Sequence, residues 1–464
     1  MSVDQELSEQ PVELDLELLP PARLLSVQLV ALGAKQIATF FKFNLVNVYQ
    51  VGQKLFVAET DFYDIKIEAT TAKAVREKSV CPRYWKGRLE NKSNIDRLNW
   101  EAGRRLVGGP SDFNKPMYCS DATLRRYQEK SELTKVALEK IKLLNLKTSE
   151  VFSMADLAKS SAARRLSELY FVAKNLELMA KSKHMSWLFV TFTAPPEYHP
   201  NPTHQRSKNT YRKELGPKSS HEYIRDAWGR IRAYLNKKGL QAGAESYFGF
   251  RTAETHKDGS VHWHLQVFLR GDAVANFISA CEREFSLKNQ VKFVLGDDKK
   301  GSASSYIFKY LVKEVDFSGT DSLPVAVPIE PSVDEERERQ DLASIRNGYR
   351  VKAALRSMNV RQYQLFGIGG VMTLLREINK IDFESVAEPL GDLAFEIKSN
   401  VWRSPEGLKN LISILGRTNG DGKPAIHLVK ESAKTTYGES RTRVVGVTID
   451  AYTFRSTGRY RVIF

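Results

Sequence analysis

The sequence predicts an α+β protein built from more than one domain. Its 464 residues are too many for one ordinary domain, and 42% of them are apolar, which is enough to bury cores. Short apolar runs that read as strands alternate with helical segments from Trp187 onward, which indicates one compact α+β domain over residues 183–315. The preceding residues are mainly helical, and the chain after the domain combines helical segments with strands.

The charge of the chain points to a polyanionic partner. Lys and Arg number 70 against 55 Asp and Glu, a formal net charge of +15. Three widely spaced cysteines, Cys81, Cys119 and Cys281, exclude a disulfide framework and a four-cysteine zinc site, so we expect reduced thiols. No run approaches the roughly 20 apolar residues of a membrane span, and the acidic first residues do not resemble a secretory signal. We therefore expect a cytoplasmic protein with no membrane partner.

The part before the α+β domain divides into a tail and a basic region. Residues 1–20 carry six carboxylates and no cation, and we expect a disordered acidic tail. Residues 21–182 are expected to be mostly helical and basic, with nine cations and four anions in the stretch 76–105. Candidate N-caps at Asp121 and Asp156 mark two of the helices. We interpret this N-terminal region as a candidate DNA-binding region.

Within residues 183–315 the expected strands and helices follow one another in a clear order. The run "WLFVTFTAPP" is a strand closed by two prolines, and a helix is expected from about 221 to 238. The runs "YFGFRTAE" and "VHWHLQVFL" then form two strands. A helix at 272–287, the strand "VKFVL" and a helix from Ser304 complete the domain.

Two further segments follow the domain. Residues 316–340 are rich in Ser, Pro and acidic residues, and we expect a linker or surface insertion. Residues 341–464 form a C-terminal region that is mainly helical at first and alternates like strands from about 424.

Three of the eight histidines fall in the short window "HKDGSVHWH". In "VHWHLQVFL" the period of two sends His262 and His264 to one face of the strand. The other face, which begins with Val261, Trp263 and Leu265, is wholly apolar and is expected to face the core. Two imidazoles are thus held side by side on a rigid strand, which is an arrangement that suits a metal ion.

The hairpin register supplies a third candidate ligand. If "KDG" is a three-residue loop with Gly259 in the left-handed conformation, Glu254 lies opposite His262 on the same face. A two-residue loop would instead pair Glu254 with Trp263 and bury the carboxylate without a partner, which is costly. We therefore predict a site of His262, His264 and Glu254. Nitrogen and oxygen ligands without a thiolate suit Mg²⁺ or Mn²⁺; the alternative is two surface histidines on an exposed sheet face.

The run "SSYIFKYLVKEV" forms a second candidate constellation. At the spacing of an α-helix, Tyr306, Lys309, Tyr310 and Lys313 fall within an arc of about 100°, and the aliphatic residues occupy the opposite side. A phenol is a poor nucleophile near neutral pH, because its pKa is about 10. Nearby cations favour the phenolate, and a metal can polarise the group under attack. The pattern suits attack on a phosphodiester; the alternative is an amphipathic helix with ordinary interfacial tyrosines.

The two constellations together resemble the HUH endonucleases. The run "FVTFTAPPEYHP", with Thr191 and Thr193, looks like the first motif of that superfamily, "HWH" like the second, and "YIFKY" like the third in its two-tyrosine form. Four further runs resemble the replication gene A proteins of tailed temperate bacteriophages, and the likeness covers roughly residues 75–380. These runs are "CPRYWKGRL", "SELYFVAKNLELMAKSKHMSWLFVTFTAP", "AETHKDGSVHWHLQVF" and "VRQYQLFGIGGVMTLLREI".

The resemblance implies a fold and a reaction. The HUH domain would be an antiparallel sheet flanked by helices, with the histidine strand at its centre. The protein would bind single-stranded DNA at a phage replication origin inside the bacterial host cell, with one divalent cation on His262, His264 and Glu254. Tyr306 or Tyr310 would attack the scissile phosphate, which leaves a 5′-phosphotyrosine and a free 3′-hydroxyl that primes rolling-circle replication.

The resemblance also assigns supporting roles. The second tyrosine would cut the regenerated origin, and Lys309, or alternatively Lys313, would stabilise charge on phosphate or phenolate. We expect DNA contacts from Lys313, Thr191, Thr193 and Arg251. The run "GRTNGDGK" does not fit a P-loop, so a host helicase is the expected partner for unwinding.

Two classes of alternative function remain open. Within the same superfamily, the chain could be a plasmid replication initiator, a mobilisation relaxase or a transposase. In a different class, it could be a non-catalytic DNA-binding protein in which the histidines are structural and the positive charge contacts phosphates.

Overall fold

The computed structural model confirms a mixed architecture of helices and antiparallel sheets. It comprises two compact units, Met1–Trp100 with Glu431–Arg443, and Glu101–Lys430 with Val444–Phe464. The predicted acidic tail, apart from residue 20, lies outside the described residues, and so does the whole segment 316–340. The structure describes residues 20–109, 114–202, 209–243, 245–296, 348–368, 370–378, 380–381, 425–449, 452–456 and 460–463.

The first unit packs helices around a small antiparallel sheet. The sheet has the order β1-β2-β3, and the ring of Phe41 stacks on Trp85 at 5.7 Å in the core. The turn of a C-terminal hairpin belongs to this unit, where Oε2 of Glu439 lies 2.8 Å from Nζ of Lys78. Its elements are α1 (Val27–Phe43), β1 (Tyr49–Val51), β2 (Leu55–Ala58), β3 (Ile67–Ala69), α2 (Ala72–Ser79) and most of α3 (Pro82–Gly103).

The second unit contains two small antiparallel sheets besides the central one. They have the orders β14-β4-β5 and β11-β12-β13, so the strands expected near the end of the chain are confirmed. The elements outside the central sheet include α4 (Asp121–Glu139), β4 (Lys142–Asn145), β5 (Val151–Ser153), α5 (Met154–Ser182), α10 (Val371–Ile378), β11 (Ile426–Lys434), β12 (Ser440–Ile449), β13 (Tyr452–Arg455) and β14 (Tyr460–Ile463).

The N-caps of α4 and α5 differ from the predicted residues. The hydroxyl of Ser120 accepts a hydrogen bond from Thr123 N at 3.0 Å, so Asp121 is already inside α4. In α5, Ser153 is the cap, and Asp156 closes a capping box by accepting from the Ser153 backbone N–H at 3.1 Å. Both aspartates are placed in the first helical turn, where the helix dipole favours an anion.

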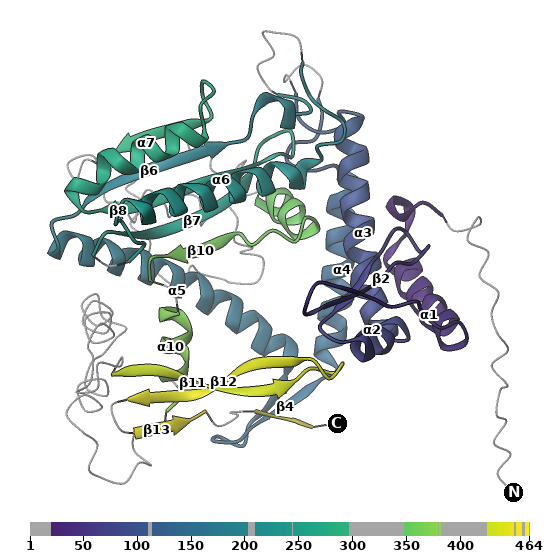
Figure 1. Cartoon of the computed structure of the whole chain (residues 1–464). Helices are drawn as coiled ribbons and strands as arrows, with labels where there is room; N and C mark the ends of the chain where they lie inside the picture. The colour runs from purple at the N-terminus through teal and green to yellow at the C-terminus, as the bar shows by residue number, and fades with distance from the viewer. Residues whose placement is uncertain are drawn as a thin grey trace, which may run out of the picture. The chain divides into compact units, whose positions relative to one another are not determined.

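The central sheet has five antiparallel strands in the order β10-β7-β8-β6-β9, with the histidine strand β8 in the middle (Figure 1). Its fifth strand, β10, comes from beyond residue 315, from a part of the chain that we expected to be mainly helical. The sheet is therefore not completed by residues 183–315 alone. The strands are β6 (Ser186–Thr193), β7 (Tyr247–Thr255), β8 (Val261–Leu269), β9 (Val291–Leu295) and β10 (Tyr363–Phe366).

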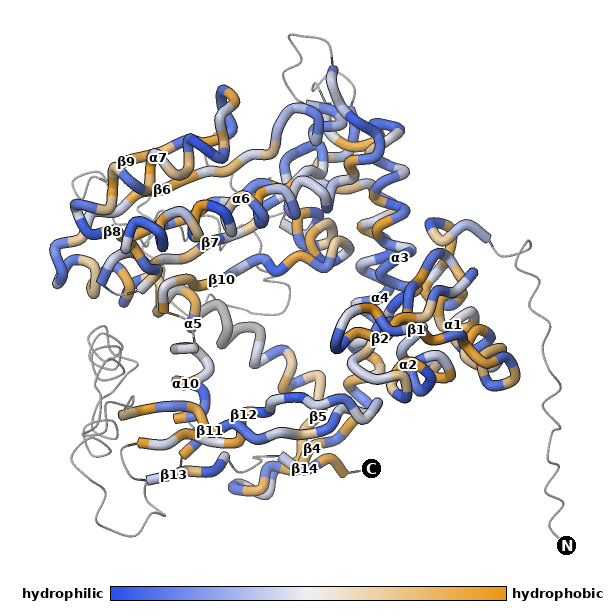
Figure 2. Tube along the Cα trace, in the orientation of Figure 1, coloured by the Kyte–Doolittle hydropathy of each residue, from blue (hydrophilic) through white to orange (hydrophobic). Residues whose placement is uncertain are grey.

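One face of the central sheet is covered by α6 (Pro217–Lys237) and α7 (Val274–Glu284). This is the face of Trp263, whose indole N–H donates a 3.0 Å hydrogen bond to His221 of α6. Figure 2 shows hydrophobic and hydrophilic residues alternating around α7, and its buried side chains include Phe277. The prediction that the apolar side of β8 faces the core is confirmed.

The opposite face of the sheet is divided between a core and a polar end. Phe248 and Phe268 pack with residues of α5 and α10, including Leu176 and Leu374, in one hydrophobic cluster. Farther along the same face, the side chains become Glu254 and the histidines of β8. The polar end of the face is thus fixed to the rigid core of the second unit.

No helix among the described residues has the length and hydropathy needed to cross a membrane. Cys81, Cys119 and Cys281 are free cysteines in the structure.

Candidate metal centre

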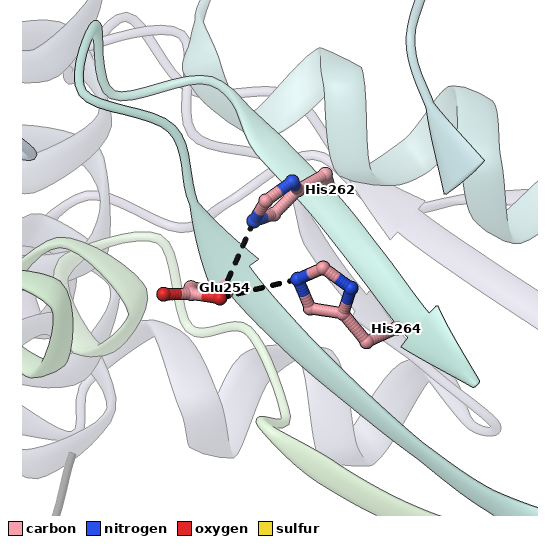
Figure 3. A group of neighbouring side chains, drawn as sticks. All are labelled: Glu254, His262 and His264. Carbon is pink, nitrogen blue, oxygen red and sulfur yellow. Dashed lines mark hydrogen bonds and ion pairs between the residues drawn. The ribbon is translucent and has the colours of Figure 1, made fainter. Parts of the chain in front are cut away.

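Glu254, His262 and His264 meet on the polar end of the central sheet (Figure 3). Oε2 of Glu254 lies 3.2 Å from Nε2 of His264 and 3.5 Å from Nε2 of His262. One ligand atom from each residue lies within 4.8 Å of the other two, and this is the one such group of ligating side chains among the described residues. All three side chains are at least half-buried, with exposed fractions of 14%, 14% and 7% in chain order.

The hairpin between β7 and β8 brings these residues together in the predicted register. Glu254 pairs with His262, and Thr252 pairs with His264. The loop has three residues, because His256 N donates to Ser260 O at 2.7 Å. Gly259 adopts a φ of +89°, a left-handed conformation that costs glycine little and other residues more. The register and the left-handed glycine are therefore both confirmed.

The geometry of the three side chains fits a divalent cation. A cation about 2.1 Å from each ligand holds neighbouring ligands of an octahedron about 3 Å apart, which is close to the two measured separations from Glu254. Nε2 of His262 is buried. Among the described residues no group makes a closer polar contact with it than Glu254, at 3.5 Å. One carboxylate and two imidazoles form a donor set that accepts Mg²⁺ or Mn²⁺ and leaves further coordination positions open.

The electrostatics of the group keep the carboxylate ionised. Burial raises the pKa of Glu254, but hydrogen bonds from His262 and His264 outweigh it, so the pKa lies well below its ordinary value. An ionised carboxylate with two adjacent imidazole nitrogens is the form that binds a cation, since metal ligands must be deprotonated.

Thr191 and Thr193 lie beside the histidines on the neighbouring strand β6. Thr191 pairs with His264 and Thr193 with His262 across the sheet. Oγ1 of Thr191 lies 3.1 Å from Nδ1 of His264. Without a cation, Nε2 of His264 donates to Glu254; with a cation bound, the ring would carry its proton on Nδ1 and donate it to the Thr191 hydroxyl, which frees the Nε2 lone pair for the metal.

A second polar cluster, which the sequence analysis missed, holds the hairpin loop. Nδ1 of His199 lies 3.2 Å from Oδ2 of Asp258, and Nε2 of His199 lies 3.2 Å from the carbonyl oxygen of Ala194. The other carboxylate oxygen of Asp258 accepts from Ser260 N at 3.1 Å and from the Ser260 hydroxyl at 2.6 Å. His199 follows the prolines after β6, so this cluster fastens the hairpin loop to the loop after β6.

The charges of this cluster stabilise each other. Burial opposes ionisation of both groups, but the contact raises the pKa of His199 and lowers the pKa of Asp258 to about 2. His256 lies between the two clusters, with its ring centroid 5.1 Å from that of His199 and 4.0 Å from that of His262. Burial and the neighbouring imidazoles lower the pKa of His256, so it packs against His262 as a neutral ring.

The structure does not bring Arg251 together with the candidate metal ligands. Arg251 is only 5% exposed and lies on the other face of the sheet, with its guanidinium 4.1 Å from the centroid of the Trp263 ring. Its Nη1 donates to Arg361 O at 2.9 Å, and its Nη2 donates to the Gln364 side chain at 2.8 Å. These contacts give Arg251 a place in the packing of β7 against β10.

The predicted nucleophiles and cations of the run "SSYIFKYLVKEV" lie outside the described residues. This applies to Tyr306, Lys309, Tyr310 and Lys313.

Comparisons with known proteins identify relatives of this chain. The family model described as "Bacteriophage replication gene A protein (GPA)" matches residues 63–318, which include all three candidate ligands. The "Replication protein" of Haemophilus phage HP1 is 24% identical over 335 residues, covering 68% of this chain and 39% of that protein. The "Replication gene A protein" of Escherichia phage 186 is 24% identical over 352 residues, covering 70% of this chain and 47% of that protein.

A further relative carries an enzymatic name. The "Probable replication endonuclease from prophage-like region" of Salmonella typhimurium is 29% identical over 234 residues, which cover 48% of this chain and 27% of that protein. The chain thus spans less than half of the length of these three relatives. No solved structure matches the chain. Because the family model covers more than half of its residues, the chain belongs to the bacteriophage replication gene A protein family.

Proposed function

We propose that this protein initiates phage DNA replication by nicking one strand at an origin, as an endonuclease of the HUH type. The observation that carries the proposal is the group of Glu254, His262 and His264 on the central strand of an antiparallel sheet. The family supplies the setting, since relatives are named replication proteins and probable replication endonucleases. The net charge of +15 supports a DNA partner.

The proposed reaction is a transesterification. The phenol oxygen of Tyr306 or Tyr310 forms a bond to the scissile phosphorus, and the bond from phosphorus to the 3′-oxygen breaks. The phenol loses its proton and the leaving oxygen gains one, which gives a 5′-phosphotyrosine and a free 3′-hydroxyl. The energy of the phosphodiester is retained in the new ester. At the end of a rolling-circle round the second tyrosine cleaves the regenerated origin in the same way, and the 3′-hydroxyl that this step frees attacks the first phosphotyrosine. The bond from that phosphorus to the first phenol oxygen breaks, which closes the displaced strand into a circle and releases the first tyrosine.

The residues of the sheet hold the reacting phosphate in this proposal. A divalent cation, Mg²⁺ or Mn²⁺, would supply Lewis-acid polarisation of the scissile phosphate from Glu254, His262 and His264. Thr191 keeps His264 in the coordinating tautomer through its 3.1 Å contact with Nδ1. Thr193, which pairs with His262, is left as a candidate contact to the DNA backbone.

The resemblance of the run "SSYIFKYLVKEV" to the third HUH motif suggests the remaining roles. Lys309 would stabilise negative charge on the phenolate or phosphate, and Lys313 would contact the DNA backbone. A host helicase would open the duplex, since the chain shows no P-loop. Arg251 is withdrawn from the expected DNA contacts, because its guanidinium is buried on the other face of the sheet.

The test is formation of a covalent protein–DNA adduct. The full chain is incubated with Mg²⁺ and single-stranded fragments that tile the replicon encoding it, and adducts that survive SDS are detected by gel shift. We expect an adduct on the fragment containing the origin, and its loss when Tyr306→Phe and Tyr310→Phe are combined. Tyr460→Phe, in the separate sheet of β14, is the matched control and should retain the adduct.

Three results would decide against the proposal. Intact DNA binding with no adduct on any fragment would favour a non-catalytic DNA-binding protein. An adduct that persists in the double tyrosine variant would show that another residue is the nucleophile. Loss of the adduct through one single substitution alone would favour the one-tyrosine chemistry of a transposase or relaxase over replication initiation.

A further inference from the structure

A cationic cavity lies at the β10 edge of the central sheet. Its volume is about 660 Å³, within the range of cavities that bind small organic ligands. Phe250 of β7 and Tyr363 of β10 form part of its wall. Charged and polar residues come from the helical residues 348–357 and the segment that follows them, with Glu168 from α5 and Arg376 from α10.

The register of the sheet places this cavity beside the candidate metal centre. Tyr363 pairs with Thr252, and Thr252 pairs with His264. Directly paired residues lie on one face, so Tyr363 is on the face of His264, two strand spacings away, or about 10 Å between Cα positions. The ring of Tyr363 stacks on Phe250, with centroids 6.1 Å apart and planes inclined by 28°, which supports this placement.

The charge of the cavity suits an anion. Lys352, Arg356 and Arg361 line it, together with an ion pair in which Nη2 of Arg376 lies 2.9 Å from Oε2 of Glu168. Glu168 is the one carboxylate among the described lining residues, and Arg376 compensates it. Four cations thus line the cavity against one carboxylate among the described residues.

The cavity also offers the polar groups that read a nucleobase. Asn359 and Gln362 line it, and the Nε2 atom of Gln362 is buried without a hydrogen-bond partner in the described part of the chain. A buried donor without a partner is costly, so a ligand acceptor at this point would be favourable. An aromatic ring, side-chain amides and cations are the groups that recognise an unstacked base and its phosphate.

We propose that this cavity, the β10 pocket, binds one nucleotide of the single DNA strand that passes the metal centre. The base stacks on Tyr363, and Arg356 and Arg361 contact the phosphates on either side. The inference rests on the proposed function, because that function brings a single strand to the same face of the sheet. A free deoxynucleotide has the same chemistry, but the position on the face of His264, two strands away, favours a nucleotide of the bound strand.

The test measures DNA binding apart from catalysis. The full chain is titrated in EDTA against a fluorescein-labelled oligothymidine of about 20 nucleotides, longer than the site of one single-strand binding module. Fluorescence anisotropy gives the affinity over a series of salt concentrations. Arg356→Ala and Arg361→Ala are compared with Arg232→Ala, an exposed arginine of α6 on the opposite side of the sheet.

The expected results separate the two kinds of contact. Each pocket arginine variant should reduce the slope of log affinity against log salt by about 0.7, the value for one phosphate contact on single-stranded DNA. Tyr363→Ala should weaken binding about 5- to 150-fold, and Tyr363→Phe, which keeps the ring, should bind as the unchanged protein does. Retained Mn²⁺ binding shows that a variant is folded at the sheet.

Other results would overturn the proposal. Affinities and slopes of the pocket variants equal to those of Arg232→Ala, with normal oligonucleotide binding by the unchanged protein, would exclude the pocket and leave the proposed function standing. If the pocket variants bind deoxythymidine monophosphate more weakly than the unchanged protein but bind the oligonucleotide equally well, the pocket would be assigned to a free nucleotide. Failure of the unchanged protein to bind single strands or to form an adduct would instead remove the proposed function.

Discussion

Oγ1 of Thr191 lies 3.1 Å from Nδ1 of His264, and the two residues are direct partners across strands β6 and β8. This contact leaves Nε2 of His264 facing Glu254 at 3.2 Å. We therefore expect metal binding at the candidate centre to depend on a hydroxyl that does not itself reach the cation site. Removal of the Thr191 hydroxyl should lower the metal affinity more than it lowers the free energy of unfolding.

The first prediction concerns this hydroxyl. Thr191→Val preserves the shape of the side chain and removes the hydrogen bond, so we expect Mn²⁺ affinity to fall about 10- to 100-fold, the usual effect of losing such an outer contact. Isothermal titration calorimetry measures the change. Thr191→Ser keeps a hydroxyl and should retain most of the affinity. Equal affinities for the Val and Ser variants would show that the contact does not orient the histidine.

The second prediction concerns metal-linked stability. A cation that binds only the folded chain stabilises it by about 2.7 kcal/mol at a concentration one hundred times the dissociation constant. Mn²⁺ should therefore raise the unfolding temperature of the unchanged protein and of Glu282→Gln, an exposed control on α7. It should leave Glu254→Gln and His262→Ala nearly unshifted. Differential scanning fluorimetry measures these shifts in unfolding temperature. A full shift in Glu254→Gln would contradict a ligand role for Glu254.

The third prediction concerns the loop cluster. Asp258→Asn should destabilise the protein by about 3–5 kcal/mol at pH 6, since it leaves the buried His199 charge without its partner. His199 has a raised pKa, so its ion pair contributes fully below about pH 6.5 and is lost as the pH rises through its folded value. The stability that ionised Asp258 contributes to the pair is lost as the pH falls from about 3.8 towards 2.

Urea unfolding at several pH values measures this effect. The destabilisation caused by Asp258→Asn should shrink as the pH rises above the folded pKa of His199. A cost that stays constant from pH 6 to alkaline pH would mean that His199 is neutral in the folded protein and that the contact is an ordinary hydrogen bond.

The fourth prediction concerns His221 on the other face of the sheet. Burial lowers its pKa to about 3, and it accepts a hydrogen bond from the Trp263 indole. As the pH falls from about 6.5 towards 3, the unfolded chain takes up a proton that the folded chain cannot accept. Stability should therefore fall with a slope of at most about 1.4 kcal/mol per pH unit from this residue.

His221→Asn keeps an acceptor for the indole and has no group that titrates in this range. The free energy of unfolding, measured with urea from about pH 7.5 to about pH 5, should depend less on pH in this variant than in the unchanged protein. The same pH dependence in both proteins would show that other groups cause the acid destabilisation.

The hairpin could be predicted from sequence because the forces that set its register are local. Gly259 allows the left-handed turn, and the alternation of polar and apolar residues on β8 decides which side faces the core. Placing Glu254 opposite His262 needed no information from outside this short segment. The same alternation predicts that Arg251 lies on the face opposite Glu254, because residues three apart on a strand point to opposite faces.

Other features could not be read from sequence because they depend on distant parts of the chain. The strand β10 is only four residues long, follows a helical segment, and joins the sheet by pairing with β7 more than one hundred residues earlier. The contact of His199 with Asp258 likewise joins two loops that are separated by 59 positions. Neither pairing leaves a periodic pattern in the sequence, so each becomes visible only when the sheet is assembled.

The most direct test of the metal centre is anomalous diffraction from crystals of the full chain soaked in Mn²⁺. The predicted result is one strong peak about 2.1 Å from a carboxylate oxygen of Glu254 and from Nε2 of His262 and His264. The peak should be absent from crystals of Glu254→Gln grown under the same conditions. A Mn²⁺ peak elsewhere, with these three side chains joined only by hydrogen bonds, would contradict the assignment of this cluster as the metal centre.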